Sequence, residues 1–181
     1  MGVPEVVARM VPKSAEQSTD PAQAVLVEMQ QGLFRYAYLL CGAAEDAHDL
    51  TQATTLRLLE SSENFTAAGY PTAYARRTMT NLYLNHRRRE LHLRSLLPSL
   101  WRVDAEPGSD AAVEDRVQLG SLLSELPGHQ KAAIVLRFYY DAATPEIASA
   151  LGCPEATVRS LIQRGLGRLR VALNDEGGRT G

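Results

Sequence analysis

The sequence has few of the residues on which small metal-binding or disulfide-bonded proteins depend. Of its 181 residues only two are cysteines. Cys41 and Cys153 are too few and too poorly placed for a disulfide framework or a paired-cysteine metal site. The four histidines share no spacing typical of metal ligands. We therefore expect no metal, no cofactor and two reduced thiols, as in a cytoplasmic protein.

Long apolar runs and catalytic motifs are missing as well. No run approaches membrane-spanning length, and Arg9 interrupts the only early apolar cluster, so we expect neither a transmembrane helix nor a signal peptide. There is no P-loop, no GxSxG and no HExxH, and no candidate nucleophile has a base beside it. The chain is therefore not expected to be an enzyme.

Aromatic residues make up only 6% of the chain, whereas Ala, Leu and Arg are plentiful. This composition favours helices. A chain of 181 residues can form one domain or two small ones. We predict an all-α protein of two small helical domains joined by a flexible linker.

The net charge of −2 conceals a strong segregation of charge along the sequence. Residues 70–94 hold six Lys or Arg against one Asp or Glu, and residues 155–181 hold five against three. The stretches before and between them are acidic, at −5 and −4. Two basic islands separated by acidic stretches predict two contacts with a polyanion and other surfaces for other partners.

The first domain is expected over residues 21–94, after a disordered arm of residues 1–20. Asp20-Pro21 is typical of a helix start, and Gly42 of its end. A second helix should start at Glu45 and Asp46, whose charge suits the helix dipole, and end near Ser61. A loop then leads to a third helix. The expected core residues of these helices are Leu26, Met29, Leu33, Tyr36, Ala37, Leu40, Ala47, Leu50 and Leu58.

The third helix, over residues 70–94, has two different sides. At helical spacing Ala75, Met79 and Leu82 fall on its inner side. The other side combines guanidinium, carboxamide, hydroxyl and aromatic groups, which suit phosphates and bases. Its candidate DNA-binding residues are Arg76, Arg77, Asn81, Tyr83, Asn85, Arg87 and Arg88. On this helix alone, a merely solvated basic face is an equally good interpretation.

Residues 95–112 contain two prolines, a glycine and scattered charge, and predict a linker. Its eighteen residues could span at most ~60 Å. A second domain is expected over residues 113–174, followed by a tail of residues 175–181. Its expected core residues are Val117, Leu119, Leu122, Leu123, Leu126, Ala132, Val135, Leu136, Tyr139, Val158, Leu161 and Leu169.

The second domain ends in a predicted helix-turn-helix. Thr144-Pro145 should cap and start a short helix, Gly152 should end it, and Pro154 should start a longer basic helix that runs to about Leu173. Two helices joined by a tight turn with glycine, the second of them basic, are typical of this DNA-binding motif. A plain helical hairpin with exposed arginines is the weaker alternative. The candidate DNA-binding residues are Ala156, Thr157, Arg159, Ser160, Gln163, Arg164 and Arg168.

Taken in order, these motifs resemble a known family. The chain reads DLTQ in its second helix, then ARRTMTNLYLNHRRR, then a loose linker, and finally ELPGHQKAAIVLRFYYDAATPEIASALGCPEATVRSLIQRGLGRLR. This order is similar to that of the extracytoplasmic-function (ECF) sigma factors of the bacterial sigma-70 family, particularly actinobacterial SigE-like sequences. The similarity covers about residues 22–173.

The resemblance implies sigma domain two over residues 21–94, sigma domain four over residues 113–174, and docking on core RNA polymerase at promoter DNA. The third helix would bind and help to melt the minus-ten element, and the loop of residues 63–69 would capture a flipped base. The helix after Pro154 would read the minus-thirty-five element, while its domain packs on the flap of the second-largest polymerase subunit. An anti-sigma factor is a further partner often found in this family. The residues implied to bind the clamp helices of the largest polymerase subunit are Asp46, Asp49, Leu50 and Gln52.

Three residues depart from the family pattern. Ala53 follows Gln52 where an acidic residue is usual, Asn85 replaces a common Asp, and Pro154 stands where a Ser often caps the recognition helix. Two other functional classes remain open on the sequence. A stand-alone helix-turn-helix regulator would be a dimer on a palindromic site. An adaptor that binds polymerase or a sigma factor would have no need of the arginines after Pro154.

Overall fold

The computed structural model describes residues 21–96 and 122–177. Within these ranges every regular element is a helix, which confirms the predicted all-α class. The expected arm, residues 97–112 of the expected linker, and residues 113–121 at the start of the expected second domain lie outside the described residues, as does the end of the tail after Gly177.

The N-terminal bundle consists of α1 (Pro21–Cys41), α2 (Ala44–Glu60), α3 (Ser62–Ala67) and α4 (Pro71–Leu96). Pro21 and Pro71 are the first residues of their helices, where a missing N–H leaves no bond unmade. Gly42 ends α1 with a φ of 83°, and its N–H donates to the Tyr38 carbonyl at 2.8 Å. This left-handed conformation suits glycine, which has no Cβ to clash.

A buried apolar stripe of α1 packs against α2 and α4. Of the residues expected in this core, Met29 and Leu50 are only half-buried, and the others are buried. The Tyr36 hydroxyl lies 2.6 Å from the Thr80 hydroxyl, which itself donates to the Arg76 carbonyl at 2.7 Å. Since the single proton of Thr80 is used in that bond, Tyr36 is the donor between the two hydroxyls. Burial raises the pKa of Tyr36 well above its usual range.

The segment expected as a loop between the second and third helices contains a short helix, α3. Phe65 of α3 is fully buried and lies 6.2 Å from the Tyr74 ring, between ring centres. This apolar anchor stabilises a turn of helix that propensity alone would leave marginal. The expectation of an irregular loop over residues 62–69 was therefore wrong for Ser62–Ala67.

The C-terminal bundle consists of α6 (Gly128–Ile134), the π-helical turn η3 (Val135–Tyr139), α7 (Thr144–Leu151) and α8 (Glu155–Gly177). Tyr139 was expected in the core but is 52% exposed. A π-helical turn contains one residue more than an α-helical turn, so the side chains after it rotate around the axis. As a result Tyr140, rather than Tyr139, reaches the N-terminal bundle, where its ring meets Tyr36 edge-on at 5.2 Å.

The helix-turn-helix is formed by α7 and α8, with Gly152 at a φ of 63° between them. Thr144 is the first residue of α7 rather than its cap. The backbone N–H of Ala143 before it donates to the Glu146 carboxylate at 2.7 Å. Pro154 likewise precedes α8, and its carbonyl accepts from the Val158 N–H. Val158 and Leu161 are buried and Leu169 is half-buried, so the recognition helix has the expected inner side.

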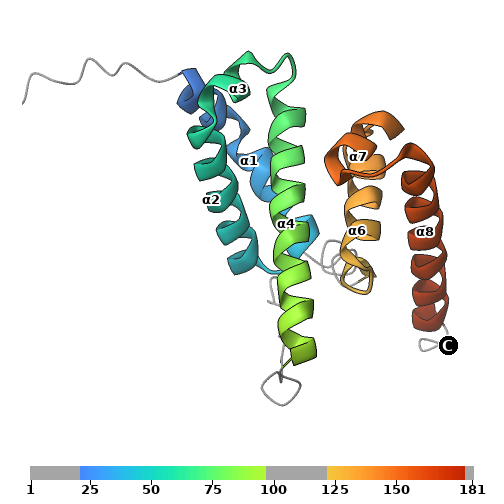
Figure 1. Ribbon diagram of the computed structural model, residues 1–181. Coiled ribbons are helices and arrows are strands. Elements are labelled where there is room, and N and C mark those ends of the chain that lie inside the picture. Colours follow the sequence, from blue (N-terminus) through green and yellow to red (C-terminus); the bar gives the residue numbers. More distant parts are fainter. Residues whose placement is uncertain (1–20, 97–121, 178–181) are drawn as a thin grey trace, which may run out of the picture.

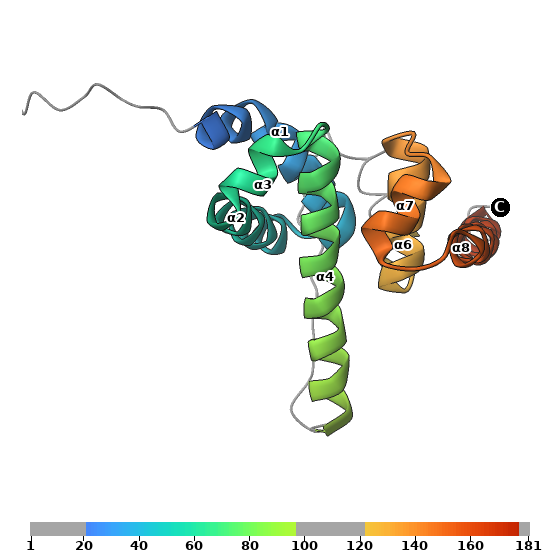
Figure 2. The same ribbon diagram turned by 45° about the horizontal axis from the view of Figure 1, so that its top comes forward.

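The two bundles pack against each other, with α4 lying between α1 and α2 on one side and α6 and α7 on the other (Figure 1). Their buried apolar side chains form one continuous core. In the turned view, the C-terminal half of α4 extends beyond the other helices (Figure 2). The sequence pattern gave no sign of this packing, since it predicted two domains on a tether.

Candidate nucleic-acid interface

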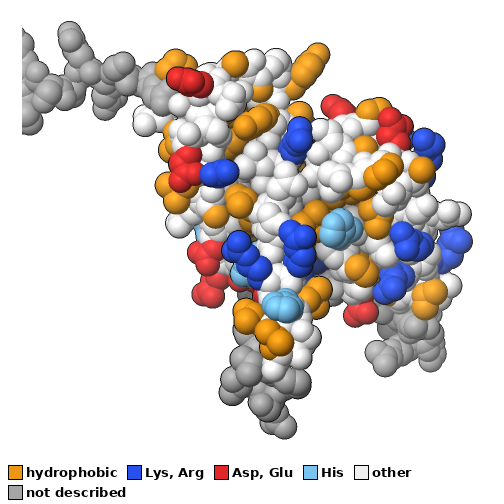
Figure 3. All heavy atoms as spheres, in the orientation of Figure 1, with side chains coloured by type: hydrophobic (Ala, Val, Ile, Leu, Met, Phe, Trp, Pro, Cys, Tyr) orange, Lys and Arg blue, Asp and Glu red, His pale blue; other side chains and the backbone are white. Residues whose placement is uncertain are grey.

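The outer side of α4 carries four exposed polar side chains at helical spacing: Arg77, Asn81, Asn85 and Arg88. The Arg88 guanidinium donates to the Asn85 carboxamide oxygen at 2.6 Å. Figure 3 shows that Lys and Arg side chains gather over α4 and again over α8 on one face of the molecule. This is the arrangement expected of a surface that follows a phosphate backbone.

A cleft of about 730 Å³ opens beside this outer side, between α2, α3 and α4. Its lining combines carboxamides, hydroxyls, a guanidinium, a carboxylate and an aromatic ring, a set able to bond with the edge of a base and to contact its face. The lining residues are Arg57, Glu60, Ser61, Asn64, Tyr74, Thr78, Asn81, Leu82 and Asn85.

Two charged side chains of the cleft bind each other. Arg57 and Glu60 form an ion pair at 3.1 Å, and both side chains are about two-thirds exposed. Exposed pairs of this kind contribute little to stability. Either partner is therefore available to a ligand at small cost. Neither residue was singled out from the sequence, because both lie outside the basic stretch of α4.

The outer side of α8 is accessible to DNA. All seven residues predicted there, from Ala156 to Arg168, are exposed. Arg159 lies 3.6 Å from the Glu155 carboxylate, and Arg164 donates to the Ser160 carbonyl at 3.2 Å. These contacts hold the two guanidinium groups along the first turns of the helix, where a recognition helix meets base edges.

The acidic side of α2 is also exposed. Asp46, Asp49 and Gln52 are accessible, while Leu50 is half-buried against the core. Ala53, where the family usually has an acidic residue, is exposed on the same helix. The predicted polymerase-binding residues are thus accessible to a protein partner.

Three of the seven residues predicted on α4 are buried or half-buried: Arg76, Tyr83 and Arg87. Tyr83 is 4% exposed and lies under the start of α6, and burial raises its pKa to about 12. Its predicted place on an exposed face is therefore wrong for this structure. The guanidinium carbon of Arg76 lies 4.6 Å from the centre of the Tyr140 ring. Arg87 is partly buried and bonds Glu90 at 2.9 Å.

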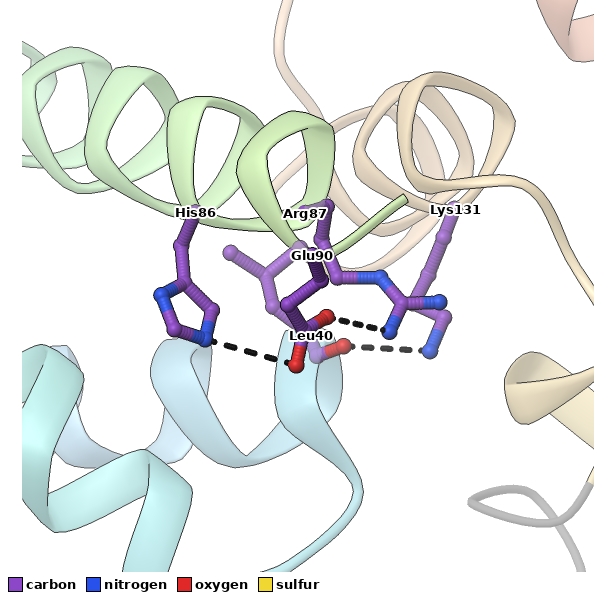
Figure 4. A network of polar contacts seen from close by, with 5 residues as sticks. All are labelled: Leu40, His86, Arg87, Glu90 and Lys131. Carbon is purple, nitrogen blue, oxygen red and sulfur yellow. Dashed lines mark hydrogen bonds and ion pairs between the residues drawn. The ribbon is translucent and has the colours of Figure 1, made fainter. Parts of the chain in front are cut away.

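A polar network surrounds Arg87 where α4, α1 and α6 meet (Figure 4). His86 and Arg87 both contact the Glu90 carboxylate, at 3.5 and 2.9 Å. Beside them the Lys131 ammonium donates to the Leu40 carbonyl at 3.0 Å, near the end of α1. Lys131 was missed from the sequence, although it lies four residues before buried Val135, on the same side of the helix.

The part of the chain that the structure describes was also compared with the requirements of a metal site and of a membrane-spanning helix. No group of three or more His, Cys, Asp or Glu side chains could hold a metal ion there. In the same residues, no helix is long and apolar enough to cross a membrane.

Comparisons with known proteins agree with the two bundles. The family model of sigma-70 region 2 matches residues 25–92, and that of sigma-70 region 4 matches residues 116–169. The RNA polymerase sigma-E factor of Streptomyces avermitilis is 32% identical over 151 residues, which cover 80% of each chain. The chain belongs to the ECF sigma factors of the sigma-70 family.

A second relative of this sigma factor is the ECF RNA polymerase sigma factor SigE of Mycolicibacterium smegmatis, 32% identical over 164 residues. That match covers 87% of this chain but 63% of the relative, less than two thirds of its length. Among solved structures, the sigma factor RpoE of Bartonella quintana, crystallised with the anti-sigma factor NepR, has the same fold, with a TM-score of 0.66 at 18% identity. The similarity covers 84% of this chain and 96% of that one.

The sigma factor therefore has α4 and its cleft in region 2, and the helix-turn-helix of α7 and α8 in region 4. The family resemblance stated from the sequence is confirmed. The roles predicted for individual residues are not tested by the comparisons and remain predictions.

Proposed function

We propose that this sigma factor binds core RNA polymerase in the cytoplasm, directs it to promoters and helps to melt the DNA. One observation carries the proposal: a single chain presents two separate exposed faces suited to DNA, on α4 of region 2 and on α8 of region 4. A specificity subunit that reads two promoter elements needs both of these DNA-binding faces. The protein itself would be non-catalytic.

Region 2 would melt the minus-ten element with the outer side of α4. Extruding a base from the duplex costs a few kcal/mol, which a pocket that accepts the base can offset. The cleft lies beside Asn81 and Asn85 and is lined by Asn64 from the stretch implied to capture the base. We assign the flipped base to this cleft, with Tyr74 as the aromatic surface.

Region 4 would read the minus-thirty-five element with α8 in the major groove. Arg159 and Gln163 on the early turns suit base edges, while Arg168 further along suits a phosphate. Pro154 provides no capping side chain, but its carbonyl accepts the first helical bond, so the missing Ser does not prevent α8 from forming.

Two protein partners are proposed on the polymerase. The acidic side of α2 would bind the clamp helices of the largest subunit, and region 4 would bind the flap of the second-largest subunit. An anti-sigma factor is a third proposed partner, since the Bartonella quintana sigma factor was crystallised with one. A stand-alone regulator is not favoured, because it has no use for a melting face and a cleft on α4.

Run-off transcription tests this function. Promoters are first located by mapping transcript starts after overexpression, and the strongest is then transcribed with purified core enzyme. We expect specific transcripts only when core enzyme and this protein are both present. Tight binding of the promoter by the protein alone, without initiation that depends on core enzyme, would overturn the proposal. A stable free dimer in light scattering would favour the stand-alone regulator instead.

A further inference from the structure

Helix α8 begins with a carboxylate, although its outer side is otherwise rich in arginine. Glu155 is the first residue of the helix and its only acidic residue before Asp175. It was not among the DNA-binding residues predicted from the sequence. The exposed arginines that follow it belong to the basic surface over α8 (Figure 3) and are Arg159, Arg164, Arg168 and Arg170.

The Glu155 carboxylate lies beside the guanidinium of Arg159, which comes one turn later. Oε2 of Glu155 is 3.6 Å from Nη2 of Arg159. Opposite charges attract at this separation, but it exceeds the about 2.7–2.9 Å of a charge-assisted hydrogen bond. The two side chains are 48% and 65% exposed, and within residues 21–96 and 122–177 no hydrogen bond engages either of them. Both side chains therefore keep their capacity to bond with a ligand.

The surroundings of Glu155 become unfavourable for a carboxylate when α8 enters a major groove. The groove is bordered by phosphates, which repel a negative charge. A carboxylate removed from water there needs a hydrogen-bond donor. On the major-groove edges of the bases, the donors are the exocyclic amino groups, N4 of cytosine and N6 of adenine. The presence of Glu155 on the first turn therefore favours a base pair that has an amino group at that place.

A G·C pair suits Glu155 and Arg159 together. Guanine presents the acceptors N7 and O6, and cytosine presents the donor N4. O6 and N4 bond each other at about 2.9–3.0 Å, which is similar to the 3.6 Å between Nη2 of Arg159 and Oε2 of Glu155. An A·T pair offers the guanidinium only O4 of thymine, beside an apolar methyl group. The reversed pair, C·G, brings the amino group to the guanidinium and two acceptors to the carboxylate, so both contacts are repulsive.

We propose that Glu155 and Arg159 together read one G·C pair of the minus-thirty-five element, in one orientation. Arg159 donates to O6 and N7 of guanine, and Glu155 accepts from N4 of cytosine. The attraction between the two side chains already holds them on one side of α8, so less rotamer freedom is lost on binding. This assignment rests on the proposed function, since it requires region 4 to bind the minus-thirty-five element.

Glu155 also has a stabilising effect on α8 itself. A negative charge in the first turn suits the helix dipole, and a Glu four residues before an Arg stabilises a helix. These effects change the stability of region 4, and they are the same for every DNA sequence that is bound. Base preference therefore distinguishes the reading of a base from the stabilisation of the helix.

The base preference is measured with the holoenzyme on a promoter located by mapping transcript starts. Each minus-thirty-five position is changed to all four base pairs, and binding is measured for the wild type, Glu155→Gln and Arg159→Ala. The matched control for charge is Glu125→Gln, since Glu125 is an exposed carboxylate of region 4 outside α8.

We expect the wild type to prefer G·C over C·G at one position by about 5- to 150-fold. Glu155→Gln should lose most of this preference at that position alone, because an amide both donates and accepts. Arg159→Ala should lose it at the same position, and Glu125→Gln should keep it. Wild-type preferences at every position in Glu155→Gln overturn the proposal, as does a loss of binding that is uniform over all sequences. Changes at two different positions overturn the shared base pair.

A cytosine analogue tests the hydrogen bond to N4 directly. Pyrimidin-2-one has the ring of cytosine without the amino group, and it replaces the assigned cytosine. It also weakens the base pair itself, but this effect is common to the wild type and to Glu155→Ala. We expect the substitution to weaken binding by the wild type severalfold more than binding by Glu155→Ala, as in a double-mutant cycle. Equal losses in the two proteins overturn the bond between Glu155 and cytosine.

Failure of the proposed function would have a different result. It would be seen as absent run-off transcription by the wild-type protein with core enzyme, or as equal initiation on all variants of the minus-thirty-five element. Promoter-specific transcription with an unchanged base preference in Glu155→Gln overturns only the assignment of Glu155.

Discussion

The guanidinium of Arg76 in region 2 lies over the ring of Tyr140 in region 4, 4.6 Å from guanidinium carbon to ring centre. Arg76 comes from the helix that carries the predicted minus-ten face. Tyr140 comes directly after the π-helical turn of region 4. A cation over an aromatic face contributes about 0.5–1 kcal/mol at an exposed site and more where it is desolvated.

The two parts of the Tyr140 side chain can be separated by substitution. Tyr140→Phe keeps the ring and loses the hydrogen bond to Gly32, so we expect a loss of about 0.5–1.5 kcal/mol in the free energy of unfolding. Tyr140→Leu also loses the contact with Arg76 and should cost about 0.5–1 kcal/mol more. Urea denaturation at constant pH measures both. Equal losses in the two variants would show that the ring contributes nothing.

The buried hydroxyl pair of Tyr36 and Thr80 predicts a strong coupling. Thr80→Val removes the acceptor of Tyr36 and leaves a buried donor without a partner, at a cost of about 1–3 kcal/mol. Tyr36→Phe should cost less, because Thr80 still donates to the Arg76 carbonyl. The double variant should be more stable than the sum of the single effects predicts, which a double-mutant cycle measures. Additive losses would contradict the bond.

Lys131 predicts a rise of stability with pH. Its pKa is about 8 in the folded protein against an ordinary 10.5, so between these values the unfolded chain binds more protons. Stability therefore increases as pH rises from about 8, by less than about 1.4 kcal/mol per pH unit. Cys41, whose pKa burial raises from 9.0 to about 12, has the opposite effect above pH 9.

The measurement for Lys131 is urea denaturation between pH 7.5 and 9. Lys131→Met is the comparison, because it keeps the length of the side chain and cannot titrate. We expect the wild type to gain stability relative to this variant as pH rises across that interval. Parallel pH profiles for the two proteins would show that the lysine is not desolvated.

Two glycines of α8 provide a matched test of the packing in region 4. A Cβ on Gly165 would lie 2.5 Å from Cδ1 of Ile134 in α6, whereas one on Gly167 would meet nothing within 4 Å. Gly167→Ala should gain up to about 1 kcal/mol from helix propensity. Gly165→Ala has the same gain in helix propensity, but its methyl group overpacks against Ile134, which should cost about 1–3 kcal/mol. We therefore expect Gly165→Ala to be less stable than Gly167→Ala. Equal thermal stabilities of the two variants would contradict the close approach of α6 and α8.

Two arginines should differ in how they bind promoter DNA. Arg159→Ala is expected to cost about 1–3 kcal/mol and to relax base preference at one position of the minus-thirty-five element. Arg88→Ala should weaken binding on all sequences and reduce the salt slope by about one. Both are measured with the holoenzyme on promoter variants at several salt concentrations. A change of base preference without a change of salt slope in Arg88→Ala would contradict its assignment to a phosphate.

The helices of region 2 and the helix-turn-helix could be predicted because their apolar residues recur at the helical period and their ends are marked by Gly42, Gly152 and prolines. The short helix α3 could not, since six residues are too few to show a period. The cleft depends on α3, so the family resemblance implied only that residues 63–69 capture a base, and not that Asn64 lines one cleft with Arg57 and Glu60 of α2.

The contact between the regions could not be predicted for a different reason. It depends on single residues far apart in the chain, such as Lys131 and Leu40, which are 91 positions apart. A lysine within an apolar stripe was the available signal, but a lysine can also extend to solvent from such a place. Tyr139 and Tyr140 were equally ambiguous, because their directions depend on the π-helical turn.

The distance along the chain between Gly32 and Tyr140, which bond each other across the two regions, has a consequence for the newly made protein. Tyr140 is added to the chain 108 residues after Gly32. At 5–20 residues per second, that interval lasts about 5–20 s. Helix α4 is complete at Leu96, 44 residues before Tyr140, so α1 and α4 exist together without Tyr140 for about 2–9 s. The pace of the ribosome sets how long that surface of α1 and α4 is accessible to nucleic acid before region 4 packs against it.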